Sequence, residues 1–135
     1  MQSSRANFED DTLSLVISLP PVTKKNSQQI VRCGNRLIPL PSKNYKQYEK
    51  DAAYFLRGNA GRRIAEPVTV TCRFFMQTHR RVDLNNLLEA ATDMLVKHGV
   101  LEDDNSTIVC SHDGSRVLYD KNNPRTEIVI SRFEP

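Results

Sequence analysis

The sequence is poor in cysteine and histidine, lacks tryptophan, and contains no long apolar run. A membrane-spanning helix needs roughly 20 consecutive apolar residues, and no stretch of this chain comes near that length. Residues 1–11 are mostly polar and acidic, without the apolar core of a secretory signal. From these absences we expect a cytoplasmic protein that does not enter a membrane.

The cysteines and histidines are also too scattered to form a disulfide framework or a zinc site. The cysteines are odd in number, and neither they nor the histidines have the paired spacing of zinc ligands. The residues are Cys33, Cys72 and Cys110, with His79, His98 and His112. We therefore expect reduced, buried thiols without a metal role.

The composition that remains suits one small domain. With 39% hydrophobic and 26% charged residues, the 135-residue chain has material for one modest core. The sequence contains no internal repeat, low-complexity tract or linker. We expect a single domain over residues 1–135, with residues 1–12 as a flexible N-terminal tail.

Charge is divided unevenly along the chain, although the net charge is only +3. From Lys24 to Arg81 the chain has thirteen Lys or Arg and three Asp or Glu. From Val82 to Pro135 it has five Lys or Arg and ten Asp or Glu. A basic region followed by an acidic region suits an enzyme that binds a polyanion with the first and a cation with the second. An ordinary solvated surface is the alternative explanation.

Residue patterns predict the following order of elements: strand, hairpin, helix, strand, helix, strand, strand. The expected ranges are strands at 13–19, 67–78, 107–119 and 125–132, a hairpin at 30–38, and a helix from Ser42 to about Arg57. Asp113-Gly114 is either a tight hairpin turn or a bulge in one long strand. This order predicts an α+β or α/β fold, with a mixed sheet and two helices packed on it.

The helix at 83–97 has the clearest signals. Asp83 is a candidate N-cap, and Lys97, His98 and Gly99 form a typical carboxyl end. One apolar stripe must be buried, and it comprises Leu84, Leu87, Leu88, Ala91, Met94 and Leu95. The opposite face carries Asn85, Glu89 and Asp93.

Cations and acids gather at the two ends of this helix. Arg80 and Arg81 precede its N-terminus, an end that attracts phosphate, and Glu102-Asp103-Asp104 follows it. Carboxylates are the hard oxygen ligands that Mg²⁺ prefers, and nearby cations would neutralise a phosphodiester. The candidate carboxylates are Asp83, Glu89, Asp103 and Asp104. A helix of this length spans roughly 22 Å, so the acidic turn must fold back to approach Asp83.

Each of these residues also has a simpler interpretation. Asp83 caps the helix whether or not it binds metal. Asp103 and Asp104 could form an exposed loop, and Glu89 and Asp93 an ordinary solvated helix face. The residues alone leave these alternatives open.

The motifs together resemble the RusA-type Holliday junction resolvases. The resemblance rests on Arg80 to Leu87, the helix through Asp93 and Leu95, Gly99 to Asp104, and the early Leu-Pro-Pro followed by Lys24-Lys25-Asn26. It implies a small, dimeric, Mg²⁺-dependent endonuclease, with Mn²⁺ as an alternative metal, that nicks four-way DNA junctions in recombination and repair. Such enzymes are often encoded by phages. The resemblance implies no small-molecule cofactor.

Carried over by position, Asp83 and Asp104 match the family's first and last catalytic aspartates, and Asp103 the neighbouring acid. The second catalytic aspartate falls on Asn85, and the family's helix lysine falls on Glu89. Our hypothesis is that Glu89, one turn from Asn85, restores the missing carboxylate. Arg80, Arg81 or Arg116 would then restore the lost positive charge.

The expected site follows from this resemblance. Asp83, Glu89 and Asp104 would hold the metal, with Asn85 and Asp103 orienting ligands or water. The expected nucleic-acid contacts are Lys24, Lys25, Asn26, Arg80, Arg81, Lys97 and Arg116. Two alternatives remain: a binding module of the same fold that has lost catalysis, and an unrelated small metal-dependent phosphohydrolase.

Overall fold

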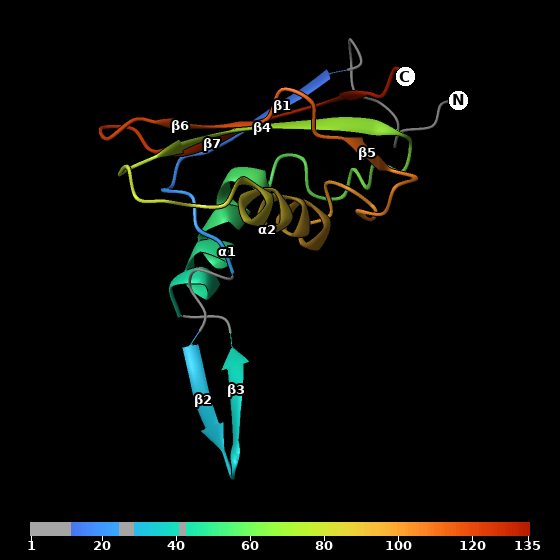
Figure 1. Cartoon of the computed structure of the whole chain (residues 1–135). Helices are drawn as coiled ribbons and strands as arrows, with labels where there is room; N and C mark the ends of the chain where they lie inside the picture. Colours follow the sequence, from blue (N-terminus) through green and yellow to red (C-terminus); the bar gives the residue numbers. More distant parts are fainter. Residues whose placement is uncertain (1–11, 25–28, 41–42) are drawn as a thin grey trace.

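Five strands form one mixed sheet, and two helices cover one of its faces (Figure 1). The computed structural model of the chain describes residues 12–24, 29–40 and 43–135. The sheet strands are β1 (Thr12–Ile17), β4 (Val68–Met76), β5 (Val109–Ser111), β6 (Arg116–Tyr119) and β7 (Arg125–Arg132). The helices are α1 (Lys43–Leu56) and α2 (Leu84–Lys97), and a separate hairpin joins β2 (Gln29–Cys33) to β3 (Arg36–Leu40).

The sheet mixes parallel and antiparallel pairs. β7 lies between β1 and β4 and is antiparallel to both, whereas β5 and β6 each run parallel to β4. The predicted α+β fold, with a mixed sheet and two helices packed on it, is confirmed. The element order agrees with the prediction as far as α2, after which three strands follow in place of the predicted two.

Buried and more exposed side chains alternate along the central strands, and this alternation decides which face of the sheet the helices cover. Successive strand side chains point to opposite faces. The buried side of β4 carries Val68, Val70, Cys72 and Phe74, and that of β7 carries Thr126, Ile128 and Ile130. Apart from Thr126, these residues meet the apolar side of α2 in one core.

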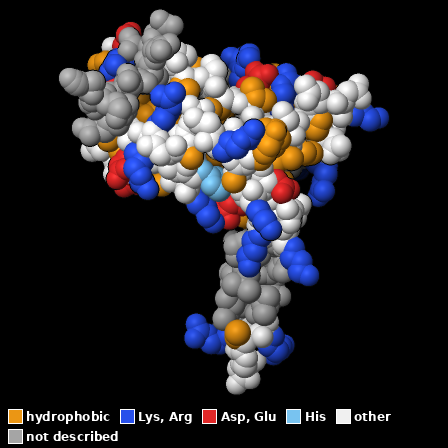
Figure 2. Space-filling model, turned by 180° about the vertical axis from the view of Figure 1, so that it is seen from behind, with side chains coloured by type: hydrophobic (Ala, Val, Ile, Leu, Met, Phe, Trp, Pro, Cys, Tyr) orange, Lys and Arg blue, Asp and Glu red, His pale blue; other side chains and the backbone are white. Residues whose placement is uncertain are grey.

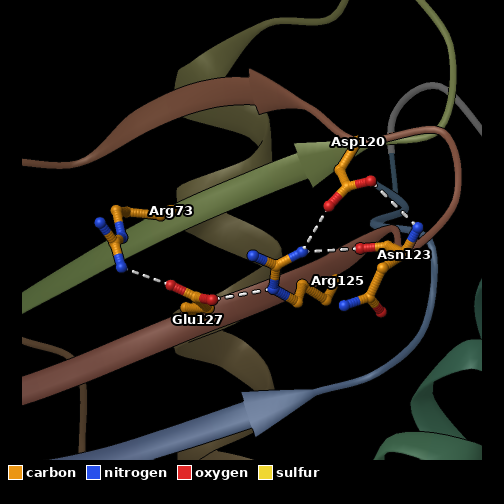
Figure 3. Close-up of polar contacts among 5 residues, drawn as sticks. All are labelled: Arg73, Asp120, Asn123, Arg125 and Glu127. Atoms are coloured by element: carbon orange, nitrogen blue, oxygen red, sulfur yellow. Dashed lines mark hydrogen bonds and ion pairs between the residues drawn. The ribbon is translucent and has the colours of Figure 1, made fainter.

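Ion pairs cover part of the other face of the sheet, where β4 and β7 run side by side (Figure 3). Arg125 donates to Glu127 Oε2 at 2.8 Å and to Asp120 Oδ2 at 2.9 Å, while Arg73 donates to the second oxygen of Glu127. The Arg125 guanidinium also lies 3.8 Å from the ring centre of Phe75. A polar network, and not a helix, therefore covers this part of the second face of the sheet.

The β2–β3 hairpin stands away from the sheet, beyond α1 (Figure 1). Gly34 occupies the turn with a φ of 64°, a conformation that favours glycine. Arg32, Arg36 and Leu37 are exposed on it. The hairpin predicted around Gly34-Asn35 is confirmed.

The single strand predicted over residues 107–119 is interrupted. β5 and β6 both pair with β4, and a turn around Gly114, with a φ of 86°, separates them. The Cys72 amide donates to Ser115 Oγ and the Thr71 hydroxyl to the Asp113 carbonyl, so groups of β4 bind the turn there. The turn at Asp113-Gly114 therefore separates two strands that run in the same direction, and it is not a hairpin turn.

Some expectations lie outside the described residues. These are the N-terminal tail up to residue 11, Lys25, Asn26 and the capping residue Ser42.

Among the helices that are described, none has the length and apolar character needed to cross a membrane.

The cysteines are free, but their burial differs. Cys72 is buried, Cys33 is exposed and Cys110 is intermediate, so the prediction of buried thiols is right for Cys72 and wrong for Cys33. Cys33 lies at the end of β2, where the hairpin has no core to enter.

We predict a large difference in thiol reactivity. Burial raises the pKa of Cys72 to about 12, so at pH 8 its reactive thiolate fraction is on the order of 10⁻⁴. Brief iodoacetamide treatment followed by peptide mass spectrometry should find Cys33 alkylated and Cys72 intact until denaturant is added. Equal labelling of both thiols in the native protein would contradict the packing of β4 against the helices.

Candidate active site

Asp83 begins α2 as its N-cap. Its backbone is extended, and its Oδ1 accepts a hydrogen bond of 3.0 Å from the Asn85 amide. The amides of Asn86 and Leu87 donate to the Asp83 carbonyl. The predicted cap is confirmed, and the Asp83 side chain stays exposed at the positive end of the helix dipole.

Arg80 and Arg81 line a cleft of about 760 Å³ beside this helix start. Its other walls come from residues 19–23, after β1, from the first half of α1, and from the end of β4. Both arginines are exposed. The lining also includes Asp51, but two guanidinium groups just before a helix N-terminus are suited to a phosphate group.

The outward side of α2 carries Asn85, Glu89 and Asp93, one helical turn apart. Asn85 and Glu89 are exposed, and Asp93 is half-buried. Asp93 Oδ2 accepts a hydrogen bond of 2.8 Å from Lys24 Nζ. This side of the helix is therefore not the uniformly solvated face that its polarity alone would suggest.

Lys24 lies between the two helices. The hydrogen bond that Lys24 donates to Asp93 is the largest cause of its raised pKa, which burial opposes and the charges of Glu89 and Glu49 reinforce. Its Nζ is also 5.9 Å from the ring centre of Tyr45. Lys24 was predicted as a DNA contact, but its pairing with Asp93, 69 positions away, has no signal in the sequence.

The chain reverses after α2 through a close approach of two loops. Gly99 has a φ of 76°, and a Cβ there would lie 3.1 Å from the Gly61 nitrogen. The Ile64 amide then donates to the Val100 carbonyl at 3.0 Å, and the Glu102 amide to the Ile64 carbonyl at 2.9 Å. This short parallel contact directs residues 102–104 back along the helix.

The returning acidic turn comes within electrostatic range of Asp93, in the second half of α2. Slight desolvation, then the charge of Asp93 and the hydrogen bond with Asp103, raise the pKa of the exposed Asp104. Its amide donates to Asp103 Oδ1 at 2.7 Å. The chain therefore folds back toward α2, but the helix charge that acts on Asp104 is that of Asp93, roughly 15 Å along the helix axis from Asp83, so the predicted approach to Asp83 is not seen.

These groups match a divalent metal in chemistry. Glu89, Asp103 and Asp104 are exposed oxygen donors, as Mg²⁺ requires. Among the residues that the structure describes, however, no three His, Cys, Asp or Glu side chains are gathered closely enough to hold an ion. The donor set fits, but it is not preassembled.

The remaining predicted cations are spread out. Lys97 Nζ lies 2.9 Å from Glu49 Oε1, which ties the end of α2 to α1. Arg116 is exposed on β6. Neither residue is grouped with Arg80 and Arg81 in the cleft.

A comparison with protein families identifies one match. The family model described as "Endodeoxyribonuclease RusA" matches residues 18–131 of the 135-residue chain. The chain belongs to the RusA family of endodeoxyribonucleases. The resemblance inferred from the sequence motifs is confirmed, and nuclease activity on DNA is the activity of this family.

The RusA match covers β4, α2 and the acidic turn, and it extends from the end of β1 into β7. A comparison with proteins of curated function finds no match to the chain.

We predict that two substitutions of Asp83 separate capping from catalysis. Asn and Asp are equally good helix caps. The free energy of unfolding of Asp83→Asn should therefore lie within about 0.5 kcal/mol of the wild-type value, whereas that of Asp83→Ala should be lower by about 1 kcal/mol. Both should lose DNA cleavage. Urea unfolding measures stability and a nicking assay measures cleavage. A fully active Asp83→Asn variant would show that Asp83 only caps the helix.

Proposed function

We propose that this RusA-family protein is a Mg²⁺-dependent endonuclease that nicks four-way DNA junctions during recombination and repair in the cytoplasm. The observation that carries the proposal is that an arginine-lined cleft lies just before the N-terminus of α2, while carboxylates follow the outward side of the same helix and the acidic turn returns toward Asp93. Phosphodiester hydrolysis needs both kinds of group.

Asp83, Glu89 and Asp104 are the proposed metal ligands, with Asn85 and Asp103 orienting ligands or water. Because these carboxylates are not gathered in the structure, the acidic turn would have to move along α2 toward Asp83 for one ion to bind all three. A bound Mg²⁺, or Mn²⁺, would polarise the phosphate and activate a water molecule. The exposed carboxylate of Glu89 lies one turn from Asn85, so it can replace the carboxylate that an amide at position 85 lacks.

The proposed DNA surface extends from the cleft to the hairpin. Residues 12–48 contain six Lys or Arg and no Asp or Glu. Figure 2 shows Lys and Arg side chains on both sides of the hairpin and on the adjoining part of the body. Among them, Arg32 and Arg36 were not expected as DNA contacts from the sequence. These cations favour a long polyanion over a small phosphorylated substrate.

We further propose a homodimer. A four-way junction has two-fold symmetry, and paired incisions need two equivalent active sites. A C2 dimer presents the same α2 surface twice.

A second candidate function is junction binding without cleavage. Asn85 is the observation that favours it, because an amide is a poor ligand for Mg²⁺. The protein would then bind DNA through its cationic surface but would not cleave it.

We predict Mg²⁺-dependent, symmetric nicks in synthetic four-way junctions and none in linear duplex of the same sequence. Asp104→Asn should abolish nicking and leave junction affinity within about threefold, since one carboxylate is removed from a surface dominated by cations. Gel assays with and without Mg²⁺ test this, with binding measured in parallel. Tight binding of branched DNA with no nicking by the wild type would favour the second candidate.

We predict that Glu89 carries the displaced carboxylate. Glu89→Gln should lose most Mg²⁺-dependent cleavage, and Asn85→Asp in the wild-type background should gain little, because the carboxylate is already supplied. Single-turnover rates on the same junction measure both effects. Near-normal rates for Glu89→Gln would eliminate this role of Glu89, and a large gain for Asn85→Asp would indicate a decayed enzyme instead.

A further inference from the structure

Four carboxylates lie around Lys24 and Asp93 or act on them, and one of these, Glu49, is also paired with Lys97. They are Glu49 on α1, Glu89 and Asp93 on α2, and Asp104 on the returning turn, and we call them the acidic surface. A phosphodiester also carries negative charge, so it is repelled there unless cations intervene. A bound divalent ion offsets only part of this charge.

Lys24 places a positive charge inside the acidic surface. Its Nζ lies 2.8 Å from Asp93 Oδ2, and Glu89 and Glu49 act on it electrostatically. The Lys24 side chain is 42% exposed and that of Asp93 is 30% exposed. The ammonium is therefore held on one side and open to an approaching anion on the other.

Two prolines and a buried threonine restrict the backbone that leads to Lys24. Pro20 and Pro21 restrict the chain after β1, and Pro21 is buried. The adjacent Thr23 is only 2% exposed. A preorganised cation of this kind loses little conformational freedom when it binds an anion.

We propose that Lys24 is a catalytic residue of this protein, whose ammonium contacts the scissile phosphate and stabilises the negative charge that develops on its oxygens. Asp93 is its positioning residue, since it directs the ammonium to the side of Glu89. This inference rests on the proposed endonuclease function. It replaces Arg80, Arg81 and Arg116 as the source of the positive charge beside Glu89.

A purely structural role predicts something different. Lys24 could serve only to relieve repulsion between Asp93 and Glu89. In that case, removing Lys24 and the Asp93 charge together would leave the surface balanced and the reaction fast. If the ammonium contacts the phosphate, the same double change leaves the reaction slow.

The test compares Lys24→Met, Lys24→Arg and the double variant Lys24→Met with Asp93→Asn. Arg73→Met is the matched control, because Arg73 also forms an ion pair with a carboxylate but lies on the opposite face of the sheet (Figure 3). Each full-length variant is measured for single-turnover nicking of a four-way junction with Mg²⁺, for junction affinity without Mg²⁺, and for melting temperature.

We expect Lys24→Met to nick about 100-fold more slowly, the effect typical of losing one charge-stabilising donor, with affinity within about threefold. The double variant should be equally slow, Lys24→Arg should be at least about tenfold faster than Lys24→Met, and Arg73→Met should match the wild type. The double variant guards against a folding defect, because it leaves no unpaired charge.

Three results would overturn the role of Lys24. Nicking by Lys24→Met at the wild-type rate would remove it from catalysis, and recovery of rate in the double variant would reduce it to charge balance. A loss of affinity equal to the loss of rate would make it a binding contact only. A wild-type protein that binds junctions but never nicks them would instead refute the endonuclease function, and the catalytic role with it.

Discussion

The burial of one side of α2 against the sheet is the constraint on which the candidate site depends. Leu87, Ala91 and Leu95 enter the core, and this fixes the rotation of the helix about its axis. Because successive helical residues are offset by about 100°, Asn85, Glu89 and Asp93 must then point away from the sheet. A shift of one residue in this packing would turn the whole polar stripe away from the loops that now border it.

Two loops complete the surface, and each is held by backbone constraints. The loop after β1 is stiffened by Pro20 and Pro21 and delivers Lys24 to Asp93. The loop after α2 turns at Gly99, pairs with residues 61–64, and returns the acidic residues to the helix. The two departures from the family pattern then have a common physical interpretation. The carboxylate missing at position 85 is supplied from Glu89, and the positive charge missing at position 89 is supplied from another element of the fold.

Local patterns in the sequence predicted the local structure well. The cap at Asp83, the buried stripe of α2, the hairpin and most strands depend on neighbouring residues, whose periodicity and turn chemistry can be read directly. The break between β5 and β6 was not predicted, because it depends on hydrogen bonds from β4, some 40 residues away. The Lys24–Asp93 contact and the approach of Asp104 to Asp93 were missed for the same reason. Both depend on how distant loops cross the helix, which no short pattern encodes.

The central claim is that the outward stripe of α2, with Lys24 and the returning acidic turn, is where DNA and metal meet. The most direct test is an anomalous-scattering map from crystals of the protein with a non-cleavable four-way junction and Mn²⁺. The account predicts a manganese peak in each protomer bound by Asp83, Glu89 and Asp104, with Lys24 Nζ within hydrogen-bonding distance of a phosphate oxygen. Manganese bound away from α2, or DNA phosphates that do not approach Lys24, would contradict it.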